Sequence, residues 1–138
     1  MRVVDAAAAI AELRELSTQI ESVVVAPRDG APIASSVPDA DALRMVESAR
    51  ALADGADQVR RDLGRDALAQ LQAATPDGSV FVVVDEQRMA VATTGADPTV
   101  GLVFYDLKTL LRQLAQDDVG DDNGDNGGEG GEGGDGSA

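Results

Sequence analysis

The stretch IESVVVAPRDGAPIASS, residues 20–36, decides the fold. A β-branched run precedes the turn sequence PRDG, and a second short apolar run follows it, with Pro27 and Pro32 flanking the turn where a lost N–H donor is tolerated. In the Asp29-Gly30 pair, glycine supplies the residue that tolerates a positive φ in a tight turn. A second block, SVFVVVDEQRMAVATT at residues 79–94, has the same organisation. Two hairpins among helical segments predict an α+β fold.

Length and composition limit the possible functions. The 138 residues fit one domain at 1–117 followed by a tail at 118–138, which is rich in Gly, Asp and Glu and too poor in apolar residues to fold, so disorder is expected there. The chain has no cysteine and no histidine. This excludes thiolate nucleophiles, imidazole-based triads, disulfides and Cys/His zinc sites. We therefore expect a protein that is not an enzyme and that holds no cofactor and no metal.

The charge is strongly acidic, with a formal net value of −14. Residues 117–138 hold eight acids and no base, and the rest of the chain holds seventeen acids against eleven bases. Contacts with phosphates or anionic lipids need clustered Lys and Arg, so neither nucleic acid nor a membrane is an expected partner. The composition suits a haloarchaeon or another organism with an acidic proteome, because high salt screens the repulsion. Without a long apolar run or a signal-peptide layout, a cytoplasmic location is expected.

Apolar residues at steps of three and four predict three helices, at residues 3–17, 39–61 and 97–116. The last has Asp97 as its expected N-cap and Pro98 at its first position, and the middle one starts with Asp39 or Asp41 as its N-cap. The middle helix has a wide, alanine-rich apolar arc, formed by Leu43, Val46, Ala49, Leu52, Ala53, Ala56 and Val59. Either this arc packs on both a sheet and a second copy of the helix, or alanine is present only as a strong helix former.

Residues 65–75, RDALAQLQAAT, are ambiguous. Their propensity favours a helix that continues from the preceding one. Alternation of Ala69, Leu71 and Ala73 with Gln70 and Gln72 instead suits a strand with one wet face, and the sequence PDG that follows is a turn signal.

The predicted order of helix, hairpin, long helix, strand, hairpin and helix, with Asp29-Gly30 in the first turn and Gly101 near the start of the last helix, resembles the Roadblock/dynein light chain family. The resemblance covers residues 5–115. It implies a strand at 65–75 and a five-stranded antiparallel sheet, with the long helix on one face and the two terminal helices on the other.

The resemblance also implies a dimer and a function. Family members dimerise side by side, through the edge strand before the second hairpin and through antiparallel packing of the long helices. The matching residues here are Val46, Ala49, Ala53 and Ala56 on the helix and Ala69, Leu71 and Ala73 on the strand. The implied function is a non-catalytic homodimeric regulator or scaffold that binds a Ras-like small GTPase and modulates its nucleotide cycle or localisation. The alternatives are a structural adaptor without effect on GTP turnover and a sensor of a small ligand.

Other motifs have simpler interpretations. Asp85-Glu86 is a carboxylate pair on a predicted turn, with no nucleophile nearby in the sequence. The tail segment 121–132 ends in a glutamate as an EF-hand loop does, but it has asparagine at the sixth position, where that loop needs glycine. Arg60-Arg61 suits the end of a helix, where cations offset the helix dipole. The sequence contains neither GxxxxGK[ST] nor GxGxxG, so we expect no nucleotide hydrolysis by this chain itself.

Overall fold

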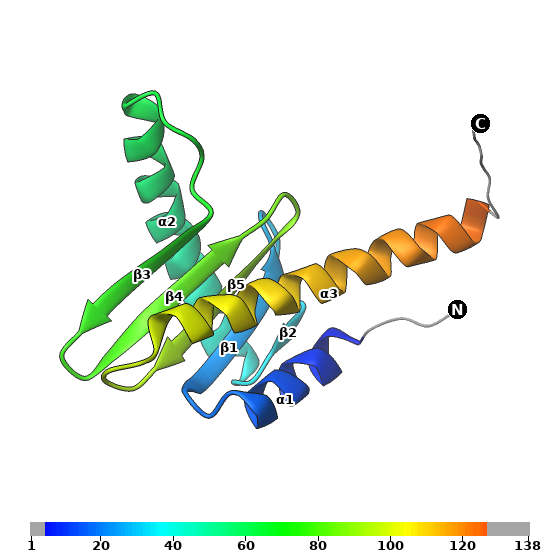
Figure 1. Cartoon of the computed structure of the whole chain (residues 1–138), viewed down its shortest axis with the longest axis horizontal. Coiled ribbons are helices and arrows are strands. Elements are labelled where there is room, and N and C mark those ends of the chain that lie inside the picture. Colours follow the sequence, from blue (N-terminus) through cyan, green and yellow to red (C-terminus); the bar gives the residue numbers. More distant parts are fainter. Residues whose placement is uncertain (1–4, 127–138) are drawn as a thin grey trace.

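The computed structural model describes residues 5–126 and confirms the α+β class and the predicted order of elements (Figure 1). In chain order, the elements are α1 (Ala6–Leu16), β1 (Ile20–Pro27), β2 (Ala34–Ser35), α2 (Asp39–Asp62), β3 (Gln70–Thr75), β4 (Gly78–Val84), β5 (Arg88–Thr94) and α3 (Val100–Asn126). The strands form one antiparallel sheet in the order β2-β1-β5-β4-β3. Both predicted hairpins are present, and β2 and β3 are the two edges.

The sheet is covered on both faces, with α2 on one and α1 and α3 on the other (Figure 1). Successive side chains of a strand point to opposite faces. In β1, Val23 and Val25 therefore join the core under α1 and α3, whereas Val24 and Ala26 join the core under α2. This double burial explains why the strand is a continuous apolar run instead of an alternating one.

The core under α1 and α3 contains the larger side chains. Phe81 of β4 and Phe104 of α3 meet edge to face, with ring centroids 5.0 Å apart and an interplanar angle of 77°. Around them lie the apolar stripes of the two helices, formed by Ala9, Ile10, Leu13, Val103, Leu107, Leu110, Leu111 and Leu114. Burial of these stripes fixes both terminal helices to the sheet.

The core under α2 is built from small residues on the helix. Ala42, Val46, Ala49 and Ala53 are all buried there against Met89 and the valines of the strands. Because three of the four helix side chains end at Cβ, the helix backbone lies close to the sheet. Of the alanines in the predicted arc, Ala49 and Ala53 thus belong to the core of the same chain.

Two details of α2 and of the first turn differ from expectation. Pro38 holds the N-cap position of α2 and makes no side-chain cap bond, so neither Asp39 nor Asp41 is the cap; both lie in the first turn, where carboxylates favour the helix dipole. Gly30 does not have a positive φ. A Cβ there would instead lie 3.1 Å from Cγ of Pro27, so close approach of the proline ring explains the glycine.

The last helix starts later and ends later than predicted. Asp97 has a φ of 57°, which a right-handed helix excludes, and the first helical bond runs from the N–H of Val103 to the carbonyl of Thr99, at 3.1 Å. Instead of ending near Gln116, the helix continues to Asn126. No proline interrupts it, and a helix propagates easily once nucleated. The rest of the expected tail, residues 127–138, lies outside the described residues.

Candidate dimerisation and partner-binding surface

The strand expected before the second hairpin is present, although it is shorter than residues 65–75. β3 comprises Gln70–Thr75 and pairs with β4, so the helical alternative is wrong for these residues. Of the predicted interface residues, Leu71 and Ala73 are half-buried on β3, and Ala69 is exposed just before it. The Ala69 carbonyl accepts a 2.9 Å hydrogen bond from the N–H of Val84. As an edge strand, β3 offers its other side for pairing with a further strand.

The predicted helix residues lie mainly on the inner face of α2. Val46, Ala49 and Ala53 are buried against the sheet of the same chain, and Ala56 is half-buried. The face that α2 presents to solvent carries larger apolar side chains, of which Leu52 is 43% exposed. The sequence reasoning therefore identified the core-facing side of this helix more than its free side.

Four residues of the predicted arc belong to a longer repeat along α2, which runs from the core-facing side to the free side and which the sequence analysis did not separate from the rest of the arc. Apolar residues recur at alternating steps of four and three along one flank of α2, continuing into the residue that follows the helix; they are Met45, Ala49, Leu52, Ala56, Val59 and Leu63. A four-three spacing is the pattern of helices that pack against another helix along a seam. The same spacing was visible in the sequence.

A groove runs beside this flank, between α2 and the sheet. Its volume is about 310 Å³, and it is lined by Arg44, Met45, Ser48, Ala49, Leu52, Val80, Val91 and Thr93. Most of these side chains are apolar, and the groove lies on the α2 face of β4 and β5. An open apolar groove beside a four-three seam and an open strand edge is suited to helix and strand packing from a second molecule.

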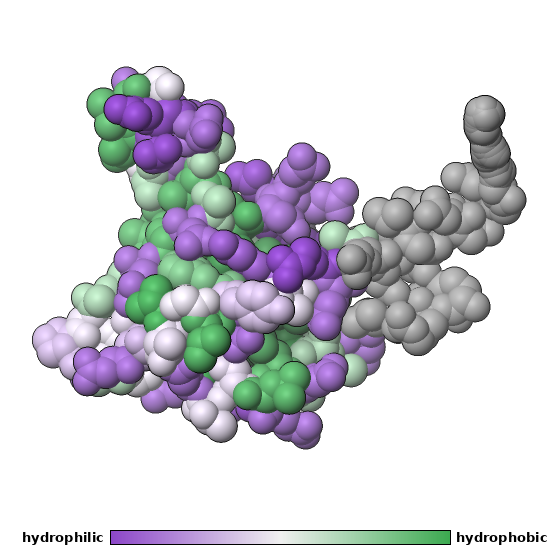
Figure 2. Space-filling view, viewed as in Figure 1, coloured by the Kyte–Doolittle hydropathy of each residue, from purple (hydrophilic) through white to green (hydrophobic). Residues whose placement is uncertain are grey.

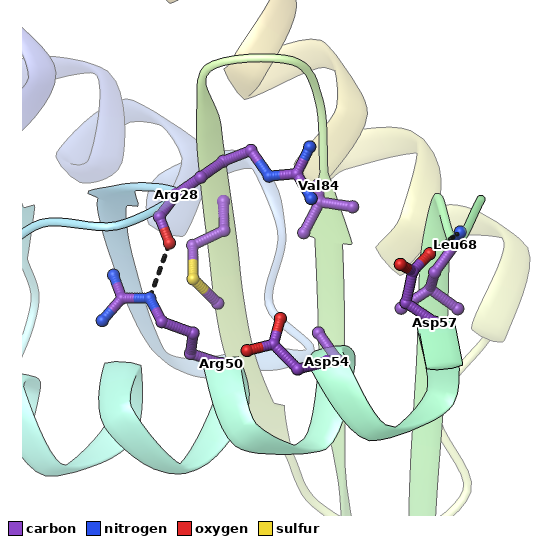
Figure 3. Close-up of a pocket in the computed structure, with 8 residues that line it drawn as sticks. Arg28, Arg50, Asp54, Asp57, Leu68 and Val84 are labelled. Carbon is purple, nitrogen blue, oxygen red and sulfur yellow. Dashed lines mark hydrogen bonds between the residues drawn. The ribbon is translucent and has the colours of Figure 1, made fainter. Parts of the chain in front are cut away.

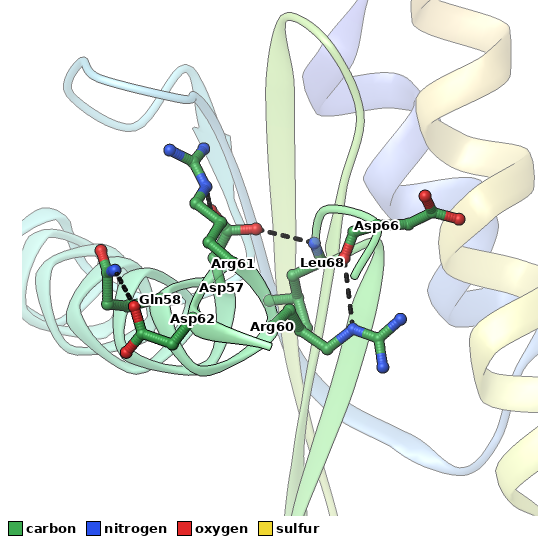
Figure 4. A network of polar contacts seen from close by, with 7 residues as sticks. All are labelled: Asp57, Gln58, Arg60, Arg61, Asp62, Asp66 and Leu68. Carbon is green, nitrogen blue, oxygen red and sulfur yellow. Dashed lines mark hydrogen bonds and ion pairs between the residues drawn. The ribbon is translucent and has the colours of Figure 1, made fainter. Parts of the chain in front are cut away.

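The connection from α2 to β3 is held by a polar network at the end of the helix (Figure 4). The carboxylate of Asp57 accepts a 2.7 Å hydrogen bond from the N–H of Leu68 and pairs with Nε of Arg61 at 2.7 Å. The bond from Leu68, followed by the charge of Arg61, keeps the pKa of Asp57 below its ordinary value although partial burial opposes this. Nε of Arg60 donates to the carbonyl of Asp66 at 3.2 Å. The Arg60-Arg61 pair thus anchors the connection to β3.

Arg50 fastens the first hairpin to α2 (Figure 3). Its Nε donates to the carbonyl of Arg28 at 2.6 Å, and its Nη2 donates to the carbonyls of Pro27 at 3.0 Å and Gly30 at 2.7 Å. The adjoining pocket, which Asp54 helps to line, has a volume of about 20 Å³. That is room for about one water molecule, so this pocket is no site for an organic ligand.

The other candidate motifs have structural roles in the part of the chain that is described. Oδ1 of Asp85 accepts the N–H groups of Gln87 and Arg88, at 2.8 and 2.7 Å, and so caps the turn between β4 and β5. Among residues 5–115, whose side chains the structure describes, no group of three or more acidic side chains is placed to hold a metal ion. The EF-hand-like segment at 121–132 extends outside the described residues. No helix within the described range has the length and apolar character needed to cross a bilayer.

Comparison with known proteins gives the fold. No protein-family profile and no curated protein sequence matches the chain. A Roadblock/LC7 domain from Streptomyces avermitilis superposes with a TM-score of 0.74 at 14% identity, over 83% of this chain and 97% of that one. Myxococcus xanthus MglB superposes with a TM-score of 0.70 at 13% identity, over 81% of this chain and 86% of that one. An MglB in a tetrameric arrangement superposes with a TM-score of 0.69 at 15% identity, again over 81% of this chain and 86% of that one.

These similarities lend no support to the haloarchaeal or other acidic-proteome source expected from the composition. At such low identities they show the architecture alone. The chain has the fold of Roadblock/LC7 domains, with three helices around a five-stranded antiparallel sheet.

Proposed function

We propose that this chain is a Roadblock-type domain that forms a homodimer and, as a dimer, binds a Ras-like small GTPase in the cytoplasm without performing chemistry of its own. The observation that carries the proposal is the coincidence of three features on one side of the molecule. The four-three apolar flank of α2 borders the apolar groove, the groove extends over β4 and β5, and β4 is the neighbour of the open edge strand β3. A similar fold, that of an MglB, has been seen in a tetrameric arrangement, which supports association of copies.

The dimer is tested by replacing Leu52 with aspartate. Leu52 is partly exposed and lines the groove, so the substitution leaves the core of the single chain intact. In a two-fold dimer the loss occurs twice, and we expect the dissociation constant to rise by about 100-fold or more. Light scattering should give twice the chain mass of 14.1 kDa for the native protein and the single mass for Leu52→Asp.

The matched control is Ile33→Asp, which places the same charge at an equally exposed aliphatic residue next to the opposite sheet edge. It should leave the dimer intact. A native protein that is monomeric at all accessible concentrations, or two variants that dimerise equally well, would overturn the dimer assignment.

The partner is tested with purified small GTPases loaded with GDP or with a non-hydrolysable GTP analogue. Binding that prefers one nucleotide state and changes the hydrolysis rate supports a regulator. Binding in both states with an unchanged rate assigns the chain to the adaptor class instead. Absence of binding while the dimer persists refutes the GTPase proposal and leaves the dimer standing.

A further inference from the structure

A second groove lies on the opposite face of the sheet, between α1 and α3. It has a volume of about 170 Å³, and its lining comes only from the two helices; the residues are Ala9, Glu12, Leu13, Leu16, Tyr105, Asp106, Thr109, Leu110 and Gln113. The floor is formed by the buried residues Ala9, Leu13 and Leu110, which belong to the core. The groove is therefore a gap between two helices that are themselves fixed to the sheet.

Large apolar side chains on the flanks of this groove are left in solvent. Leu16 is 77% exposed and Tyr105 is 61% exposed, and both line the groove; Leu102, one turn before Tyr105 on α3, is 55% exposed. Figure 2 shows hydrophobic surface over the end of α1 and over the start of α3, with polar surface around it. An apolar patch with a polar rim on a folded domain is typical of a surface that binds another protein.

The charge at the groove is negative. Glu12 of α1 and Asp106 of α3 both line it, and its lining contains no Lys or Arg. Three cations lie nearby outside the lining. Arg14 donates to the carbonyl of Glu21 at 3.2 Å, Arg112 donates to Oγ1 of the lining residue Thr109 at 3.0 Å, and Lys108 is exposed on α3 between Asp106 and Thr109. A partner that buries the apolar patch would place its own rim residues beside the two carboxylates, where Lys and Arg are favoured.

The dimensions favour a helical segment over a small molecule. Pockets that enclose organic ligands hold about 300–1,000 Å³, and this groove is smaller. It has room for one or two side chains of a partner, and its two walls are helices. An amphipathic helix that lies along such a gap inserts residues spaced three or four apart and leaves its flanks at the rim.

We propose that the groove between α1 and α3 binds an amphipathic helix of a partner protein, whose apolar stripe is flanked by Lys or Arg. This site is separate from the α2 and β3 surface and lies on the other face of the sheet. The chain would then join two partners through two faces, and the inference stands whether or not the chain dimerises.

The test uses two fluorescein-labelled helical peptides with the same leucine stripe, one flanked by arginine and one by glutamate, titrated with the full-length protein by anisotropy. We expect the arginine-flanked peptide to bind at least about 10-fold more tightly. The double substitution Leu16→Gln and Tyr105→Gln should weaken that binding about 10-fold or more. Glu12→Gln with Asp106→Asn should reduce both the affinity and its dependence on salt.

The matched control is Ile33→Gln, at an exposed aliphatic residue that does not line this groove, and it should bind the peptide as the native protein does. Light scattering checks that the double variant keeps the native mass, which separates this site from the dimer surface. The proposal is overturned if neither peptide binds, if both bind equally, or if the double variant binds like the native protein. Self-association that the double variant abolishes would assign the groove to a second copy of this chain.

Discussion

Arg50 offers the sharpest test of how the first hairpin is held against α2. Its guanidinium donates three hydrogen bonds to carbonyls of the turn between β1 and β2, at 2.6, 2.7 and 3.0 Å. Replacing Arg50 with methionine keeps much of the apolar stem and removes all three donors. The effect on the free energy of unfolding then measures the polar contacts.

The size of the effect follows from the number and exposure of these bonds. A hydrogen bond that involves a charged group contributes about 1.5–3 kcal/mol when its partners are buried. Arg50 is only half-buried, and the carbonyl of Arg28 lies at the surface, so water replaces part of what is lost. We expect Arg50→Met to lower the free energy of unfolding by about 2–3 kcal/mol. Arg50→Lys should lose about half of that, because one ammonium cannot reproduce the fork.

The measurement is urea unfolding followed by far-UV circular dichroism. For a domain of this size, the expected loss moves the midpoint by about 1–2 M. Arg44→Met is the matched control, since Arg44 lies on the same helix but makes an exposed ion pair with Asp41, which is worth about 1 kcal/mol at most. Comparison at two protein concentrations separates folding from self-association. Equal midpoint shifts for the two methionine variants, or a lysine variant as stable as the native protein, would refute the reasoning.

Two further predictions concern acid stability and backbone packing. Because the pKa of Asp57 is lowered in the folded state, its stabilising contribution is full above the unfolded-state pKa of about 3.9 and is lost as the pH falls through the lower folded-state value. Asp57→Asn should therefore flatten the fall in melting temperature below about pH 4. The matched substitution at the exposed residue Asp54, Asp54→Asn, should leave that fall unchanged. Gly78→Ala should lower the free energy of unfolding, measured in urea, by about 1–3 kcal/mol, because its Cβ would lie 2.5 Å from the carbonyl oxygen of Thr94. Gly55→Ala, on α2 with no atom near the added Cβ, should raise the free energy of unfolding by up to about 1 kcal/mol. The test is whether the two substitutions change the free energy of unfolding in opposite directions.

Local sequence signals were sufficient for the order of elements and for both hairpins. The β-branched runs at 20–27 and 79–84 are buried on both faces, so they could hardly form anything but central strands. Local sequence signals were not sufficient to predict the structure of residues 70–75. Their helix propensity is overruled by pairing with β4, and Gly64, with a φ of 68°, helps to separate them from α2.

The candidate surface was predicted less well, for a physical reason. The apolar arc of α2 is wide enough for two packing partners, and hydrophobicity alone suggests that the larger residues face the core. The sheet instead takes the small residues, such as Ala49 and Ala53, and leaves Leu52 and Val59 at the surface. The hydrogen bonds of Arg50 to the first turn join residues about twenty positions apart, and no periodic pattern in the sequence predicts them. Asp97 takes its positive φ in the link to α3, where the sequence pointed to an ordinary N-cap.

The two edges of the sheet differ in a way that limits how far copies of this chain can polymerise. β3 offers six residues at one edge, whereas β2 has only two at the other. Growth of a fibre by strand addition needs two usable edges on every subunit, one for each neighbour. A chain with one usable edge stops growing once that edge is paired. The short length of β2 therefore disfavours the formation of filaments. A substitution that extended β2 would create the second edge that filament growth requires.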